Sequence, residues 1–139
     1  MVTSAFADTN LFLRFLTQDP ADQAQAAEAT LRRAAAGELK LVTTPLVFAE
    51  LAWTLRSFYG HGREEIAQML LALLNTPGIE VESADRLIQA VVWFDEKNVD
   101  FIDAYHAAWL LERPFATVYT FDQKHFSRFS HLQVEVPSL

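Results

Sequence analysis

The sequence predicts an α/β fold, a three-layer α/β/α sandwich with a mostly parallel five-stranded sheet between helical layers. Short apolar runs of strand length alternate along the chain with longer helical segments. Of the residues, 51% are hydrophobic and 12% aromatic, which is enough to build a packed core. With 139 residues and no repeat or Pro/Gly-rich linker, we expect a single domain over residues 1–139.

The N-terminal segments show clear start and stop signals. An apolar run over residues 4–7 predicts a buried strand, and a helix is expected to begin near Asn10. Asp19-Pro20 indicates the next helix start, with proline in the first helical position. The alanine-rich run over 21–36 favours a helix, and Gly37 is typical of the residue that follows a helix.

The rest of the chain continues this alternation, with glycine and proline separating the segments. We expect further strands at 39–43, 79–82, 117–120 and 133–136, and further helices at 45–59, 64–75, 84–97, 101–112 and 123–129.

Composition excludes several classes of function. Because the chain has no cysteine, it has no disulfide framework, no thiolate nucleophile and no Cys-ligated metal. The net charge of −7 argues against passive coating of nucleic acid, which normally needs a basic excess. No signal peptide is visible, and no apolar run approaches the roughly 20 residues that span a bilayer, so we expect a soluble cytoplasmic protein.

Two aspartates each follow a predicted strand and precede a predicted helix. Asp8 follows the first strand and Asp122 follows the fourth. In open α/β sheets, functional groups gather beyond the carboxyl ends of the strands, so both positions suit a site. Aspartate is also a favoured N-cap, and a simple capping role explains each residue equally well.

Glu50 and Asp103 lie within predicted helices. The i±3 and i±4 neighbours of Glu50 are mostly apolar and include no basic residue, which predicts an inward-facing carboxylate in need of a cation. A surface glutamate at the edge of the apolar stripe is the alternative. Asp103 shares a largely apolar face, although it also suits the first turn of a helix capped by Asp100.

The four acids occur in a known order. Through Asp8-Thr9-Asn10, Ala49-Glu50-Leu51, the 103–108 segment Asp-Ala-Tyr-His-Ala-Ala and Thr120-Phe121-Asp122, the chain resembles the PIN-domain family of ribonucleases. It looks most like the compact VapC-type toxins of type II toxin–antitoxin systems. The resemblance covers essentially the whole chain and implies a PIN-like sandwich that binds Mg²⁺ or Mn²⁺ to cleave RNA.

The resemblance also implies roles for individual residues. The catalytic and metal-binding set is Asp8, Glu50, Asp103 and Asp122. Polar positions beside them, expected to orient carboxylates or metal-bound waters, are Thr9, Asn10 and Thr120. Basic residues near these segments that would suit RNA phosphates, or serve only solubility, are Arg14, Arg113, Lys124 and Arg128. His106 is three residues from Asp103, and an ordinary partly buried histidine is the expectation there.

Partners follow from the same resemblance: RNA, a cognate antitoxin that covers the active site, and a second copy of the chain as a homodimer. Helices at 45–59 and 64–75 are apolar enough to supply such a surface or to be core. The alternatives are a housekeeping RNA-processing PIN nuclease and a catalytically silent PIN-like binding module. An aspartate-nucleophile phosphotransferase would require a second aspartate at Asn10.

Overall fold

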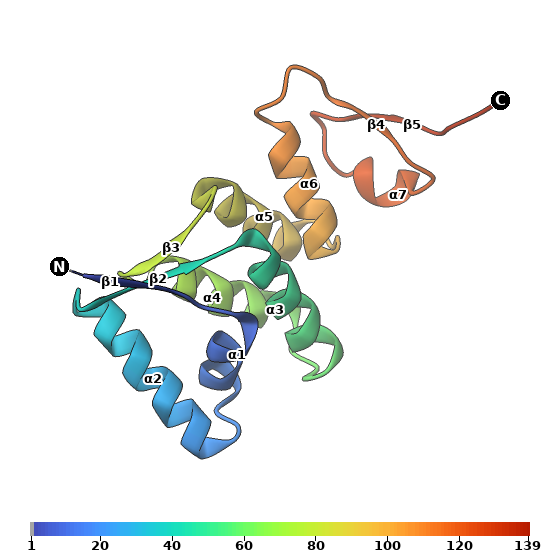
Figure 1. Ribbon diagram of the computed structural model, residues 1–139. Helices are drawn as coiled ribbons and strands as arrows, with labels where there is room; N and C mark the ends of the chain where they lie inside the picture. Colours follow the sequence, from blue (N-terminus) through green and yellow to red (C-terminus); the bar gives the residue numbers. More distant parts are fainter. Residues whose placement is uncertain (1) are drawn as a thin grey trace. The chain divides into compact units, whose positions relative to one another are not determined.

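The computed structural model describes residues 2–139, which divide after Ala84 into two compact units. The first unit contains a parallel three-stranded sheet and four helices (Figure 1). Its elements are β1 (Thr3–Phe6), α1 (Thr9–Thr17), α2 (Ala21–Ala35), β2 (Leu39–Thr43), α3 (Pro45–Ser57), α4 (Arg63–Leu74) and β3 (Ile79–Val81).

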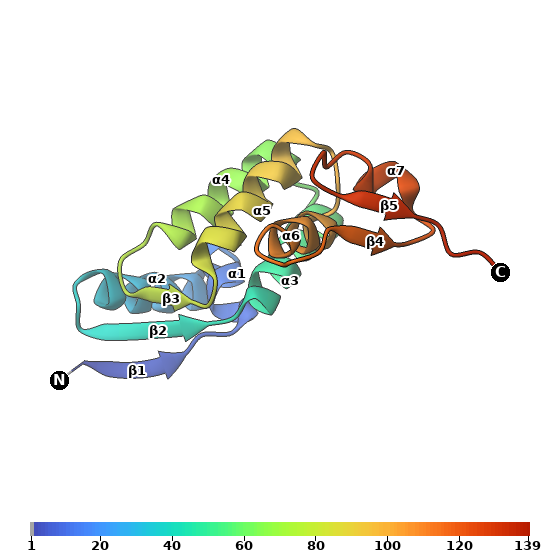
Figure 2. The ribbon, with the colours of Figure 1, turned by 90° about the horizontal axis from the view of Figure 1, so that it is seen from above.

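The sheet of the first unit has the order β1-β2-β3, with all three strands running in the same direction (Figure 2). Leu39, Leu41 and Thr43 of β2 are buried while Val42 between them is exposed, as the two-residue period of a strand requires. Because the strands are parallel, the loops that follow β1 and β2 leave the same edge of the sheet. These loops lead into α1 and α3.

Helices α1 and α3 of the first unit pack against each other through buried aromatic side chains. Phe12 and Phe48 are fully buried, and their ring centroids are 6.4 Å apart. Leu51 and Leu55 continue the buried face of α3. This packing fixes α1, which follows Asp8, beside α3, which carries Glu50.

The second unit contains three helices and a parallel two-stranded sheet. Its elements are α5 (Ala84–Glu96), α6 (Phe101–Leu110), β4 (Thr117–Tyr119), α7 (Gln123–Phe126) and β5 (Gln133–Glu135). Its aromatic contacts include Trp93 against Phe129, with ring centroids 5.0 Å apart, and Phe94 against Phe101 at 6.3 Å. The two backbone carbonyls at Lys97 and Asn98 accept hydrogen bonds from the guanidinium of Arg128, which ties α7 to the end of α5.

The α/β class with parallel strands is confirmed, and the expected elements are all present with ends that shift by at most three residues. The expectation that the first strand is buried was wrong, because all four residues of β1 are exposed. One detail differs, because the five strands form a three-stranded and a two-stranded sheet. Apolar alternation indicates where strands are and which side chains they bury, but it does not specify which edges pair. The expected position of Pro20 was wrong by one residue, since it is the N-cap of α2 and Ala21 is the first helical residue.

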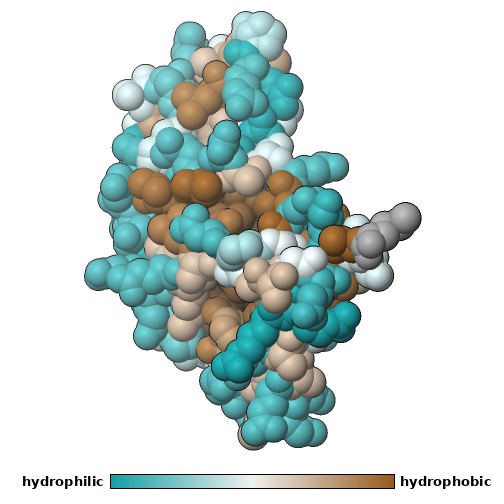
Figure 3. Space-filling view, turned by 90° about the vertical axis from the view of Figure 1, so that its left-hand side faces the viewer, coloured by the Kyte–Doolittle hydropathy of each residue, from teal (hydrophilic) through white to brown (hydrophobic). Residues whose placement is uncertain are grey.

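Several large apolar side chains reach the surface in both units, and Figure 3 shows apolar groups among hydrophilic ones on one face. In the first unit the most exposed are Leu46, Trp53, Phe58 and Phe6. In the second unit they include Phe121, Tyr119, Phe115 and Ile102. None of the described helices combines the length and apolar character needed to cross a membrane.

Candidate metal centre

In the first unit, two of the predicted acids share a small polar pocket. Its volume is about 200 Å³, and its lining is formed by Asp8, Thr9, Asn10, Leu13, Glu50 and Thr54. The two carboxylates come from the start of α1 and the middle of α3, 42 residues apart in sequence (50 − 8). The structure therefore brings together Asp8, Glu50, Thr9 and Asn10, all predicted site residues.

Hydrogen bonds position the carboxylates of this pocket. Asp8 is the N-cap of α1, and its Oδ1 accepts the backbone N–H of Leu11 at 3.3 Å. The hydroxyl of Thr9 donates a hydrogen bond to Oε1 of Glu50 and so links α1 to α3. Capping uses one lone pair of Asp8 and leaves its other oxygen free, so the capping role and a metal-binding role are compatible.

The expectation that Glu50 faces inward was wrong. Glu50 is exposed, and the neighbouring apolar residues on its face, Leu46 and Trp53, are 79% and 67% exposed. The apolar stripe that suggested burial is a surface feature of α3, whose core face is formed by Val47, Phe48 and Leu51. Because Glu50 is exposed, its charge needs no cation to offset a cost of burial. Its assignment to the site rests on the pocket that it shares with Asp8.

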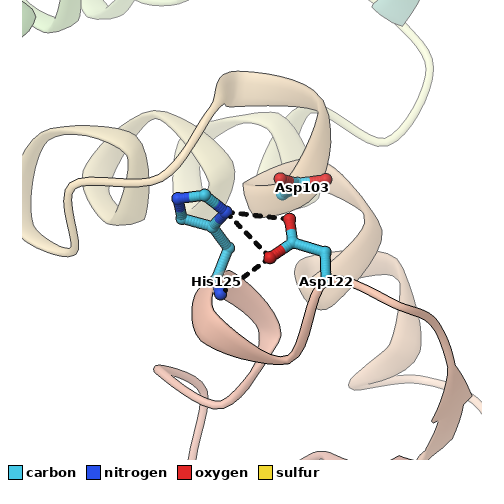
Figure 4. A group of neighbouring side chains, drawn as sticks. All are labelled: Asp103, Asp122 and His125. Carbon is cyan, nitrogen blue, oxygen red and sulfur yellow. Dashed lines mark hydrogen bonds and ion pairs between the residues drawn. The ribbon is translucent and has the colours of Figure 1, made fainter. Parts of the chain in front are cut away.

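In the second unit, the other two acids lie together with a histidine. Ligand atoms of Asp103, Asp122 and His125 are all within 4.8 Å of one another, and all three side chains are half-buried. Figure 4 shows the imidazole of His125 directed at the carboxylate of Asp122, with the carboxylate of Asp103 beside it. Asp103 comes from the first turn of α6, and the other two flank the start of α7.

The local backbone explains how Asp122 is held. It is the N-cap of α7, and its Oδ1 accepts the backbone N–H of His125 at 3.2 Å. The hydroxyl oxygen of Thr120 accepts the backbone N–H of Asp122 at 2.9 Å, which fixes the turn after β4. Phe126 is buried and anchors this short helix. Asp100 occupies the N-cap position of α6 as expected, but its side chain makes no capping hydrogen bond.

The two acids of the second unit have opposite electrostatic surroundings. Burial, reinforced by the negative charges of Asp100 and Asp122, raises the pKa of Asp103. Hydrogen bonds from the side chain and the backbone N–H of His125 lower the pKa of Asp122. Asp122 is therefore held ionised, while ionised Asp103 lies in a region that a positive charge would stabilise.

The basic residues considered for RNA contacts have varied surroundings. Nε of Arg14 donates to Oε1 of Gln23 at 2.9 Å, and the guanidinium of Arg113 stacks on the Trp109 ring, 4.0 Å from its centroid. Lys124 is exposed, two residues after Asp122. Arg128 donates to two backbone carbonyls, which gives it a structural role, and the phosphate contact considered above stays a prediction. His106, expected to be partly buried, is exposed.

A model of the PIN domain family matches residues 5–132. The chain belongs to the PIN domain family. The matched segment of this PIN domain includes all four acids, and PIN domains are generally nucleases that typically use divalent metals. No curated protein matches the sequence closely enough to be reported as a relative.

The residues present in this PIN domain fit a divalent cation. Carboxylate oxygens are the ligands that Mg²⁺ prefers, and Asp103 and Asp122 offer them within 4.8 Å of each other. Two carboxylates that close repel each other, and a cation between them relieves both this repulsion and the cost of burying Asp103.

Sequence reasoning missed His125 of this PIN domain. The signal that would have found it is its spacing, because a residue three positions after an N-cap aspartate lies over the capping carboxylate. Asp100 was considered only as a cap, yet its charge acts on Asp103. Both residues were missed for the same reason, because each acts on an aspartate that one helix turn brings close to it.

Proposed function

We propose that this PIN domain is a Mg²⁺-dependent endoribonuclease that hydrolyses RNA phosphodiester bonds, with Mn²⁺ as an alternative ion. The catalytic and metal-binding set is Asp8, Glu50, Asp103 and Asp122, and residues 1–139 act as a single domain. The observation that carries the proposal is the close approach of Asp103 and Asp122, in surroundings that favour a bound cation. Membership of a family of nucleases supports the reaction type.

The proposed chemistry assigns a task to each group. Bound divalent cations lower the pKa of coordinated water and stabilise charge on the phosphate during an in-line displacement. Asp103 and Asp122 would hold the cation, and Thr120 fixes the backbone that presents Asp122. Thr9 orients the carboxylate of Glu50 through its hydroxyl, and Asn10 supplies a further polar group in the same pocket.

Substrate contacts belong to the same proposal. Lys124 is exposed beside Asp122, which suits contact with an RNA phosphate next to the cleaved bond. Arg113 and Arg14 are further candidates, although each already contacts a neighbouring side chain. In a chain of net charge −7, these contacts add to the cation's own attraction for phosphate.

Incubation of the purified chain with structured RNAs tests the nuclease activity. We expect cleavage in Mg²⁺, none in EDTA, and restoration when excess Mg²⁺ is added back. Asp8→Asn and Asp103→Asn remove one acid from each unit and are expected to abolish the cleavage seen with the wild type. Cleavage that continues in EDTA or in both variants would rule out the proposed metal site.

We further propose that the protein is the toxin of a VapBC-type pair, acting in the cytoplasm, held inactive by an antitoxin and forming a homodimer. Trp53 and Phe58 are 67% and 77% exposed, so α3 offers apolar surface for a partner. The other helix considered for this surface, α4, has Leu70 and Leu73 buried in the core. Induced expression in bacteria is expected to arrest growth for the wild type and not for Asp103→Asn. Co-expression of an adjacent antitoxin gene is expected to restore growth, whereas a housekeeping nuclease would need no such partner.

A further inference from the structure

The histidine beside the acids of the second unit lies where a cation ligand would lie. Nδ1 of His125 is 2.8 Å from Oδ2 and 3.0 Å from Oδ1 of Asp122. Asp103, from another helix, contributes a carboxylate oxygen within 4.8 Å of the ligand atoms of both. Figure 4 shows the three side chains converging.

Two features fix the direction of the imidazole. The backbone N–H of His125 donates to the same carboxylate that its ring contacts, so backbone and side chain are both anchored to Asp122. The next residue, Phe126, is buried and holds the helix turn in place. With its proton on Nε2, a neutral imidazole in this orientation would present the Nδ1 lone pair where Nδ1–H otherwise donates to Asp122, so a cation could replace that hydrogen bond with little rearrangement.

We propose that His125 binds the divalent cation directly through an imidazole nitrogen, together with Asp103 and Asp122. This inference rests on the proposed function, because it adds a ligand to the same cation. An imidazole ligand also affects which ion is bound. Mg²⁺ strongly prefers oxygen ligands, whereas first-row transition ions accept imidazole, so the mixed ligand set favours Mn²⁺ and Co²⁺ over Mg²⁺.

The alternative role for His125 is to orient Asp122 by hydrogen bonding while an all-oxygen set holds the ion. Two variants separate these roles. His125→Asn keeps a side chain able to donate a hydrogen bond to Asp122 but removes the imidazole, and His125→Ala removes both. His61→Ala is the matched control, because His61 also contacts a carboxylate one helix turn away, that of Glu65, but lies outside the cluster.

Pulsed electron paramagnetic resonance of the full chain loaded with Mn²⁺ gives a readout independent of activity. We expect the nitrogen coupling of a directly bound imidazole in the wild type and in His61→Ala, and its loss in both His125 variants. Calorimetric titrations should show the preference for Mn²⁺ over Mg²⁺ falling about 10-fold in His125→Asn.

Four results would contradict this assignment of His125. Bound Mn²⁺ without nitrogen coupling, or coupling that survives in both His125 variants, overturns the inference and leaves the proposed function intact. An unchanged ion preference in His125→Asn would show that orientation of Asp122 is the whole role. Absence of any saturable Mn²⁺ binding by the wild type would overturn the proposed metal site itself.

Discussion

Hydroxyl groups hold acids in place in both units. The hydroxyl of Thr9 donates directly to Glu50, whereas that of Thr120 accepts the backbone N–H of Asp122. An oriented carboxylate loses less conformational entropy when it binds a cation, which is why residues that support metal ligands affect affinity. The Thr9 contact is the easier to test, because a single isosteric change removes it.

Thr9→Val is expected to weaken divalent cation binding by about 10-fold, because the methyl group replaces the hydroxyl that orients Glu50. Thr9→Ser keeps a hydroxyl and should bind nearly as well as the wild type. Calorimetric titration with Mn²⁺ measures both. Equal affinities for the valine and serine variants would show that the hydrogen bond to Glu50 plays no part in binding.

In the metal-free protein, the pKa values of the two acids of the second unit should be shifted in opposite directions from that of a free aspartate. Burial and the charges of Asp100 and Asp122 raise the pKa of Asp103, and the hydrogen bonds from His125 lower the pKa of Asp122. Asp103 therefore destabilises the folded state once ionised, and stability rises as pH falls through its folded pKa. Asp122 stabilises the folded state above its unfolded pKa, and that contribution is lost as pH falls through its folded pKa.

Carboxyl ¹³C NMR titration checks these directions. We expect the Asp103 midpoint to lie above the aspartate reference of about 3.9 and the Asp122 midpoint to lie below it. Asp100→Asn removes a neighbouring negative charge and should lower the Asp103 midpoint. A midpoint for Asp103 at or below that of Asp122 would refute the electrostatic description.

At the scale of elements, Asp8 and Asp122 lie at helix starts because each connects a parallel strand to the helix that follows it. In the first unit, β1 leads to α1 through Asp8, and β2 leads to α3, which carries Glu50 two turns on. In the second unit, β4 leads to α7 through Thr120 and Asp122. In a parallel sheet, the chain leaves each strand at the same edge. Polar groups of each unit can therefore lie close together there without any long loop.

Gly78, just before β3, tests how closely the first unit is packed. Its φ is +87°, and a Cβ there would lie 2.3 Å from the carbonyl oxygen of Ala34 at the end of α2. Gly37 has a similar φ of +82° but open space around it. Gly78→Ala should therefore lower the free energy of unfolding by clearly more than the roughly 1–2 kcal/mol expected for Gly37→Ala.

Urea denaturation of the two glycine variants measures this difference. Since both residues share the left-handed backbone conformation, the excess cost at Gly78 isolates the contact with α2. If the two variants lose the same stability, the close approach of β3 to the end of α2 is not a feature of the folded protein.

At the scale of the whole molecule, the sequence predicted the elements and the family better than it predicted exposure. Local signals such as the 39–43 alternation and the glycine after α2 depend on neighbours a few residues away, and they gave strand and helix positions closely. The face of α3 that carries Leu46, Glu50 and Trp53 was misjudged, because periodicity defines a face without saying what covers it. Strand pairing depended on contacts between distant segments that no local pattern encodes, whereas the spacing of His125 from Asp122 was a local signal that the prediction did not use.

The net charge of −7 gives the whole molecule a further dependence on cations. An acidic protein repels the phosphates of RNA, and each bound divalent ion offsets part of that repulsion. Metal binding thus serves substrate attraction as well as chemistry in the proposed nuclease. Excess RNA should restore substrate binding in a variant that lacks one acid, but it should not restore the reaction step.

Single-turnover cleavage of one RNA at saturating Mg²⁺ tests the central claim most directly. The series consists of Asp8→Asn, Glu50→Gln, Asp103→Asn and Asp122→Asn, with Asp19→Asn and Asp95→Asn as exposed acidic controls outside the pocket and the cluster. We predict that each of the four site variants cleaves about 100-fold more slowly or worse, while both controls keep the wild-type rate. Wild-type rates in the site variants, or an equal loss in the controls, would contradict the assignment of these four carboxylates as the catalytic metal site.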